Sequence, residues 1–311
     1  MTVDISGASD ESAVLSALPP LPPPDEVTAA RHLESGRYGN LRAALAQLAR
    51  KPVFIVALVY VLFVIVSAIF PSWFSTGQPY ATFPSDVMQS PSLHHLFGTD
   101  NIGRDLWTRV LYGSALTIKA TLLAIAIGLV AGLSFGIVSG FYGGWVDAVI
   151  MRIVDTLLAI PALLFALAII TSVGYGTIPV ALAVGLGVIP GFARTTRAEV
   201  FRVKTQPFIE AARASGASWM RVLLRHILPN SWGPVLVLAV LDAGVVIIAI
   251  ASLSFLGFGA PPPASEWGTL ISAGRDYLVT SWWLSLLPGL FVALLVLSLN
   301  HISKTLQELE R

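Results

Sequence analysis

Residues 156–193 read TLLAIPALLFALAIITSVGYGTIPVALAVGLGVIPGFA, a stretch that contains no charged side chain. A helix needs about 20 apolar residues to cross the roughly 30 Å hydrocarbon core of a bilayer. The stretch is too long for one such helix, and its SVGYG segment at 172–176 is a natural turn. We therefore expect two membrane-spanning helices here, over about residues 146–171 and 177–192.

Four further charge-poor stretches continue this pattern in both directions along the chain. The composition agrees with it, because 55% of the residues are apolar and only 12% are charged, against about 25% charged residues in a typical soluble protein. The sequence therefore predicts an all-α polytopic membrane protein with six transmembrane helices. The other four spans are expected over 52–71, about 114–140, 232–259 with Asp242 as its one charge, and 281–300 with Pro288 as a tolerated kink.

Lysine and arginine predict the orientation, because they concentrate on the cytoplasmic side of membrane proteins. If the N-terminus lies inside, only Arg104, Arg109 and Arg275 fall outside. Lys119 and Arg152 lie within or near spans, so both termini are predicted to be cytoplasmic. Fourteen basic residues fall inside: Arg31, Arg37, Arg42, Arg50, Lys51, Arg194, Arg197, Arg202, Lys204, Arg213, Arg221, Arg225, Lys304 and Arg311.

The chain divides accordingly. Its first apolar run is 20 residues long and follows a polar, proline-rich segment, so we expect a disordered tail and no cleaved signal peptide. Apolar residues at helical spacing after Tyr38 predict a short helix on the membrane surface. The expected segments are a cytoplasmic tail over 1–37, an interfacial helix over 38–51, a first span over 52–71, an extracytoplasmic loop over 72–113, a transmembrane core over 114–303 and a cytoplasmic C-terminus over 304–311.

The cytoplasmic loop over 194–231 has an internal order beyond its positive charge. Residues 210–218 read EAARASGAS, where small side chains make a narrow helix and Gly216 permits a turn. A second helical stretch begins at Trp219 and is expected to end at Pro229. Two short helices joined at a glycine between two spans predict a docking knob.

This loop resembles the EAA loop of ABC importer permeases in letters, spacing and position. The matching residues are Glu210, Ala211, Ala212, Gly216, Leu228 and Pro229. In that family the loop forms a coupling helix that sits in a groove on the ATPase subunit. The resemblance implies a type I ABC importer permease fold that forms half of a translocation pathway. It also implies a second homologous permease in a heterodimer, two ABC ATPase domains and an extracytoplasmic substrate-binding protein.

A second segment resembles the GTDxxGRD motif of the C-type permease subunit in dipeptide, oligopeptide and nickel importers. Its residues are Gly98, Thr99, Asp100, Gly103, Arg104 and Asp105. The resemblance runs from about residue 38 to the C-terminus and implies a bacterial inner-membrane permease for di- or oligopeptides, with nickel as the alternative substrate. In these relatives a carboxylate often stands two residues before the equivalent of Ser252, where this chain has Ile250.

Several residues inside the predicted spans have two interpretations. Asp155 lies either on the substrate path or in an ion pair with Arg152, three residues away on the same helical face. Asp242 is likewise a pathway residue or a structural one. Asp100, Arg104 and Asp105 either contact the binding protein or hold their loop against the bundle. Gly128, Gly132, Gly136 and Gly140 recur every four residues and predict close packing of another helix, from this chain or from a partner.

Other chemistry is not indicated by the sequence. There is no G-x-x-x-x-G-K-[ST] motif, so ATP and Mg²⁺ are expected on partner ATPases and not on this chain. No catalytic constellation is apparent, and His94–His95 is expected to be a solvated pair and no metal site. A net charge of +1 gives no reason to expect nucleic acid. The alternatives to an importer permease are an ion-driven secondary transporter, which would need inverted halves and more midplane polar groups, and a membrane scaffold.

Overall fold

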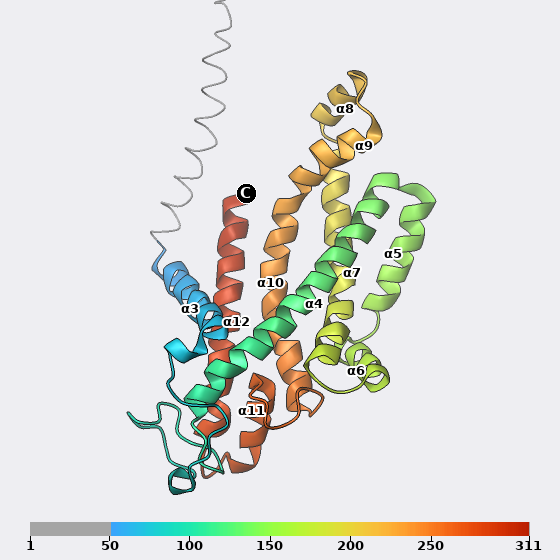
Figure 1. Ribbon diagram of the computed structural model, residues 1–311. Coiled ribbons are helices and arrows are strands. Elements are labelled where there is room, and N and C mark those ends of the chain that lie inside the picture. Colours follow the sequence, from blue (N-terminus) through green and yellow to red (C-terminus); the bar gives the residue numbers. More distant parts are fainter. Residues whose placement is uncertain (1–50, 311) are drawn as a thin grey trace, which may run out of the picture. The chain divides into compact units, whose positions relative to one another are not determined.

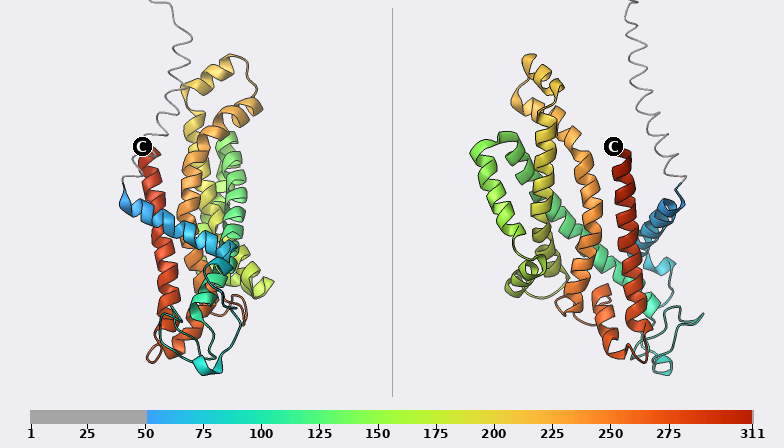
Figure 2. Two further views of the ribbon diagram at one scale, coloured as in Figure 1. Left: turned by 60° about the vertical axis from the view of Figure 1, so that its left-hand side comes forward. Right: turned by 180° about the vertical axis from the view of Figure 1, so that it is seen from behind.

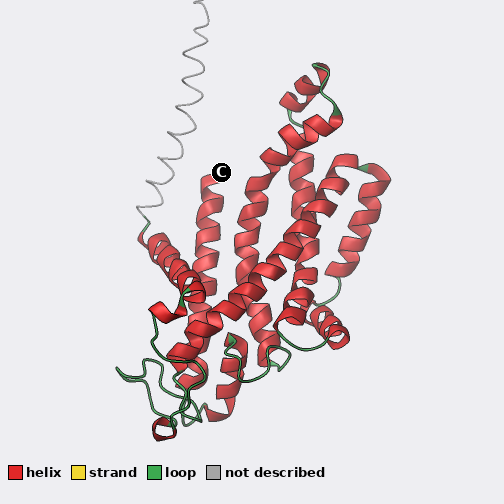
Figure 3. Ribbon diagram, in the orientation of Figure 1, coloured by secondary structure: helices red, strands yellow, loops and turns green. Residues whose placement is uncertain are grey.

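The computed structural model describes residues 51–310, which form helices joined by turns and loops (Figures 1 and 3). The expected tail over 1–37 lies outside the described residues, as does the interfacial helix over 38–51 except for Lys51. The helices are α3 (Pro52–Ile69), α4 (Leu106–Tyr142), α5 (Gly144–Leu158), α6 (Ala162–Val173), α7 (Thr177–Lys204), α8 (Pro207–Ala214), α9 (Trp219–Val222), the π-helical turn η3 (Leu223–Ile227), α10 (Leu228–Phe255), α11 (Trp267–Gly274) and α12 (Trp283–Glu310), with short 3₁₀ turns at Pro71–Trp73, Pro84–Asp86 and Arg275–Tyr277.

Within residues 51–310, five helices are long and apolar enough to cross a membrane, and the bent pair α5–α6 supplies a sixth crossing if it counts as one span. The five are α3, α4, α7, α12 and a continuous helix over Trp219–Phe255 that contains α10. The multi-pass helical architecture predicted from the sequence is thereby confirmed. The cytoplasmic position of both termini stays a prediction.

The helix α4 begins at Leu106, eight residues before the span expected from about 114, so part of the expected extracytoplasmic loop is helical. The cause is an N-cap: the Asp105 carboxylate accepts hydrogen bonds from the Thr108 backbone N–H and hydroxyl, both at 2.7 Å. A carboxylate at this position satisfies a backbone donor that the helix cannot satisfy itself. The resulting helix is 37 residues long.

The third span was predicted as one helix over 146–171, and this was wrong. The chain bends by 91° between α5 and α6. Pro161 explains the break, because a proline has no backbone N–H and disfavours helical geometry in the residue before it, here Ile160. α5 therefore ends at Leu158, before the proline. Pro161 occupies the N-cap position of α6, which begins at Ala162.

The prediction that Pro229 ends the second knob helix was also wrong. α9, η3 and α10 follow one another without interruption, and Pro229 stands in the first turn of α10. Proline is tolerated in a first turn, where its missing N–H is not needed. α7 and α12 likewise continue past their expected ends, to Lys204 and Glu310.

The bundle has two different ends. α8 and α9 project at one end, which is also where α12 finishes (Figure 1). The connection between α3 and α4 and the short helix α11 gather at the other end, as both further views show (Figure 2). α4 lies diagonally across the bundle and packs most extensively against α7, while α12 packs against α3, α10 and α11.

Candidate functional site

The segment between α7 and α10, residues 205–227, is called the knob here. It has a small hydrophobic core of its own, in which Ile209, Val222 and Ile227 are fully buried. The core is shared with Val200 and Val203 from the end of α7. Because these side chains pack α8 and η3 against the end of α7, the knob is anchored to that helix.

Gly216 makes the turn between α8 and α9. Its φ of +84° lies in the left-handed region that favours glycine. The Ala217 N–H donates to the Ala212 carbonyl at 3.1 Å, and the Gly216 N–H donates to the Arg213 carbonyl at 2.9 Å. This pair of bonds is a Schellman motif, which satisfies carbonyls that the end of α8 would otherwise leave free.

The small side chains of α8 face in two directions. Glu210, Ala211 and Ala214 are exposed, whereas Ala212 is half-buried against the core of the knob. The expectation that the alanines make a narrow surface thus applies to Ala211 and Ala214. Ala212 instead packs against the core of the knob.

Aromatic and basic side chains brace the base of the knob. The Arg213 guanidinium carbon lies 3.9 Å from the Trp219 ring centroid, a stacking contact in which the ring attracts the cation. Lys204 donates from its Nζ to the Phe141 carbonyl at 2.5 Å, which ties the end of α7 to the end of α4. Leu228 and Pro229, the last residues of the matched loop motif, lie in the first turn of α10.

The second motif lies at the opposite end of the bundle and forms a closed turn. The Asp100 carboxylate accepts from the Ile102 and Arg104 backbone N–H groups and from Arg104 Nε, the last at 2.6 Å. Arg109 Nη1 lies 3.6 Å from the same carboxylate. Of the two roles considered for these charges, the geometry favours holding the loop against the bundle.

The remaining residues of that motif fix the backbone of the loop and the start of α4. Gly98 and Gly103 have φ of +75° and +79°, a conformation that is strained for other residues. The Thr99 hydroxyl donates to the Asp86 carbonyl and accepts from the Gln89 N–H. Asp105 caps α4 and also contacts His95, whose Nδ1 lies 2.8 Å from its carboxylate. No cluster of three potential metal ligands occurs among the described residues.

The four glycines of α4 face α7. A Cβ at Gly136 would stand 2.6 Å from the Ala193 carbonyl oxygen and 2.9 Å from the Arg197 backbone nitrogen. Gly128 and Gly132 would meet Phe192, and Gly140 would meet Val200, in the same way. The close approach therefore occurs within this chain, and it is one of the two arrangements considered from the sequence.

The structure corrects one ion pair inside the spans. Asp155 does not pair with Arg152; it accepts from Arg194 of α7 at 2.6 Å. The two helices run side by side, so a partner across the interface is nearer than one on the same helix. Asp242 is half-buried in α10, and no ion pair to it occurs among the described residues.

Sequence reasoning missed two polar groups. Asp147, in the first turn of α5, is bound by Arg197 of α7 through two hydrogen bonds and by the Ser139 hydroxyl of α4. Glu266 is fully buried and accepts from the Ser254 hydroxyl and the Ala260 N–H, each at 2.9 Å. The only signal for Asp147 was an acid three residues after the Gly143–Gly144 turn.

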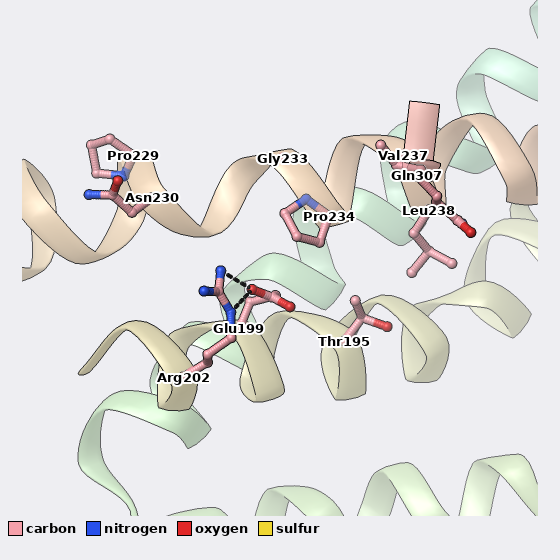
Figure 4. Close-up of a pocket in the computed structure, with 10 residues that line it drawn as sticks. All are labelled: Thr195, Glu199, Arg202, Pro229, Asn230, Gly233, Pro234, Val237, Leu238 and Gln307. Atoms are coloured by element: carbon pink, nitrogen blue, oxygen red, sulfur yellow. Dashed lines mark hydrogen bonds and ion pairs between the residues drawn. The ribbon is translucent and has the colours of Figure 1, made fainter. Parts of the chain in front are cut away.

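Cavities lie along both faces of α7. One, of about 810 Å³, opens between α7, α10 and the end of α12 (Figure 4). Glu199 and Arg202 of α7 pair at 2.7 Å on one wall, and Pro234 of α10 stands opposite them. A cavity of about 310 Å³ between α6, α7 and α10 is lined almost wholly by apolar side chains.

This chain resembles known proteins in sequence. Residues 132–309, more than half of the chain, match the family described as binding-protein-dependent transport system inner membrane component. The chain is 36% identical to the dipeptide transport system permease protein DppC of Alkalihalophilus pseudofirmus, over 92% of each chain. It is 38% identical to the glutathione transport system permease protein GsiD of Escherichia coli O157:H7, over 95% of this chain and 94% of the relative.

Solved structures agree on the fold. A chain of the MetNI methionine ABC transporter in an inward-facing conformation superimposes with a TM-score of 0.53, at 19% identity, over 65% of this chain and 97% of the other. An amino acid ABC transporter solved with histidines gives 0.51, at 17% identity, over 63% and 91%. The chain belongs to the family of binding-protein-dependent ABC transport permeases. It is a multi-pass membrane protein of that family.

Proposed function

We propose that this chain is one permease subunit of an ATP-driven peptide importer in the bacterial inner membrane. The observation that carries the proposal is the knob, in which Glu210 and Ala211 stand exposed on a helix anchored to the ends of two long spans. A rigid projection of this kind suits a groove on another protein. Its termini and the knob face the cytoplasm in this proposal, in keeping with the basic residues around it.

The partners follow from the same reading. A second, homologous permease completes the translocation pathway, and two ATPase domains receive the two knobs. ATP and Mg²⁺ bind to those ATPases, because this chain has no phosphate-binding loop. A substrate-binding protein delivers its cargo at the opposite end of the bundle. Relatives named for dipeptide and glutathione transport support a peptide as the cargo in preference to nickel.

Replacement of Ala211 by tryptophan tests the knob. Ala211 is exposed and lies outside the knob core, so the bulky side chain leaves the fold intact but obstructs a close-fitting partner. In the complex assembled with its cognate subunits, we expect loss of ATPase co-purification and of ATP-dependent uptake of labelled di- to pentapeptides. Val279→Trp is the control for ATPase co-purification, because Val279 is 98% exposed at the other end of the bundle. Full co-purification and uptake with Ala211→Trp would refute the docking role.

A further inference from the structure

We propose that Asp147 and Arg197 form a clasp that carries movement of the knob into the bent pair α5–α6. The inference rests on the proposed function and adds to it two positioning residues that lie outside the knob. Arg197 Nε lies 2.5 Å from Asp147 Oδ1, and Arg197 Nη2 lies 2.6 Å from Oδ2. A two-point bond between a guanidinium and a carboxylate fixes orientation as well as distance.

Residues of α4 support the clasp. Gly136 and Gly140 of α4 let the Arg197 backbone lie against them, at 2.9 Å and 3.0 Å from where a Cβ would stand. The Ser139 hydroxyl, between those glycines in the sequence, donates to the carboxylate. Asp147 follows the turn at Gly143 and Gly144, which brings the start of α5 back beside α7. Three helices therefore meet at one carboxylate.

α5 has few buried side chains. Of its fifteen residues only Val154 is buried. Among the described residues, the second ion pair between α5 and α7 is Asp155–Arg194, in which both side chains are more than half exposed. Because apolar packing hardly attaches α5 to α7, the ion pairs determine whether the two helices move together.

The other end of this connection, the bend between α5 and α6, borders open space. Cavities of about 310 Å³ and 220 Å³ lie beside the bend, and both are lined by Ala162 and Gly187. α6 packs through Ala166 and Ile170 into the core formed by α7 and α10. Open space beside the break would allow α5 and α6 to change their angle, which a close-packed interior would resist. Val200 and Val203, one and two turns beyond Arg197, belong to the knob core. The path thus runs from the knob through α7 and the clasp to the bend.

The test compares Asp147→Asn and Arg197→Gln with the charge-swapped pair Asp147→Arg/Arg197→Asp in the full reconstituted complex. Each single variant is expected to keep ATPase co-purification and ATP hydrolysis, while peptide moved per ATP hydrolysed falls about fivefold or more. The charge-swapped pair is expected to recover part of that ratio. Glu199→Gln is the matched control, because its partner Arg202 lies on the same helix and joins no second element.

A second readout separates transmission from simple stability. The chain has no cysteine, so spin labels at Val149→Cys in α5 and Phe201→Cys in α7, both exposed, report the distance between the helices. With a non-hydrolysable ATP analogue, the distance distribution should stay narrow in the parent complex and broaden in Asp147→Asn. An unchanged transport ratio with an unchanged distribution would overturn the clasp. Loss of assembly without a change in that ratio would also overturn it, by making the pair merely structural. Absence of uptake in the parent complex would instead refute the proposed function.

Discussion

Glycines of α4 determine how closely α4 and α7, the most extensively packed pair of helices, approach each other. Gly136 has carbonyl and amide atoms of α7 where a side chain would begin, so no rotamer change can make room. Gly289 of α12, by contrast, has nothing within 4 Å of the same position. Both residues are helical glycines in spans, and only their surroundings differ. The four-residue spacing of the glycines in α4 predicted that Gly136 lies at a close helix contact.

Gly136→Ala should therefore destabilise the protein by about 1–3 kcal/mol, the usual consequence of overpacking a filled site. Gly289→Ala should be neutral or stabilising by up to about 1 kcal/mol, because alanine is the better helix former. Thermal unfolding of the detergent-solubilised chain measures both. Equal midpoints for the two variants would contradict the close packing of α4 on α7.

At the scale of elements, the knob is a short helical hairpin whose geometry depends on one left-handed residue. Gly216 has open space around it, so backbone conformation and not crowding selects glycine there. Asparagine tolerates the same conformation better than other residues with a side chain, whereas a β-branched residue does not. The turn can thus be altered without touching any neighbour.

Gly216→Val is expected to loosen the hairpin at a cost of about 1–2 kcal/mol, and Gly216→Asn to resemble the parent. Trypsin reports the difference, because Arg213 and Arg221 flank the turn and are exposed. Cleavage should be faster in Gly216→Val, with the unfolding midpoint of the bundle nearly unchanged. The same cleavage rate in all three proteins would mean that the turn does not depend on left-handed geometry.

Most of the helical architecture could be predicted from charge-free length alone, because lipid leaves the backbone few other options. The breaks between helices could not be predicted in this way. Pro161, Pro190, Pro234 and Pro288 look alike in the sequence, yet only Pro161 separates two helices while the others lie inside one. Whether a helix continues past a proline depends on the packing of neighbouring helices, which a local pattern does not contain.

The candidate site divides in the same way. The positions of Glu210 and Gly216 on a helix and its turn followed from spacing, since short helices and glycine turns are local. Spacing did not predict that Ala212 faces inward, nor did it predict the partners of Asp147 and Asp155. Each of these depends on which helix lies opposite the residue. An acid in a span predicts a partner, but its identity is a property of the assembled bundle.

For the molecule as a whole, exposed aromatic residues gather at two levels. Trp73 and Trp282 are exposed near the end that carries the GTDxxGRD motif, and Tyr142 and Trp145 are exposed at the turn between α4 and α5, toward the knob. Tyrosine and tryptophan favour the two headgroup regions of a bilayer. The levels agree with a membrane that covers the bundle between them and leaves the knob in water.

Single cysteines test the orientation in this cysteine-free chain. Leu93 and Val279 are 95% and 98% exposed at one end, and Ser215 is exposed on the knob. An impermeant maleimide added to spheroplasts should label cysteines at 93 and 279 but reach position 215 only after lysis. Ser265 is unsuitable because it is buried. Labelling of position 215 alone in intact spheroplasts would invert the predicted topology.

The uninterrupted helix over Trp219–Phe255 makes the knob one arm of a lever. Its 37 residues extend about 55 Å, so a tilt of about 5° about the knob end displaces the far end by about 5 Å. That displacement is comparable to one helical turn. The π-helical turn η3, the last segment of the knob, lies between α9 and α10, and π-helical turns of this kind often occur where helices bend. The stiffness of five residues, 223–227, therefore sets how much of any angular motion at the knob arrives near Phe255 as translation.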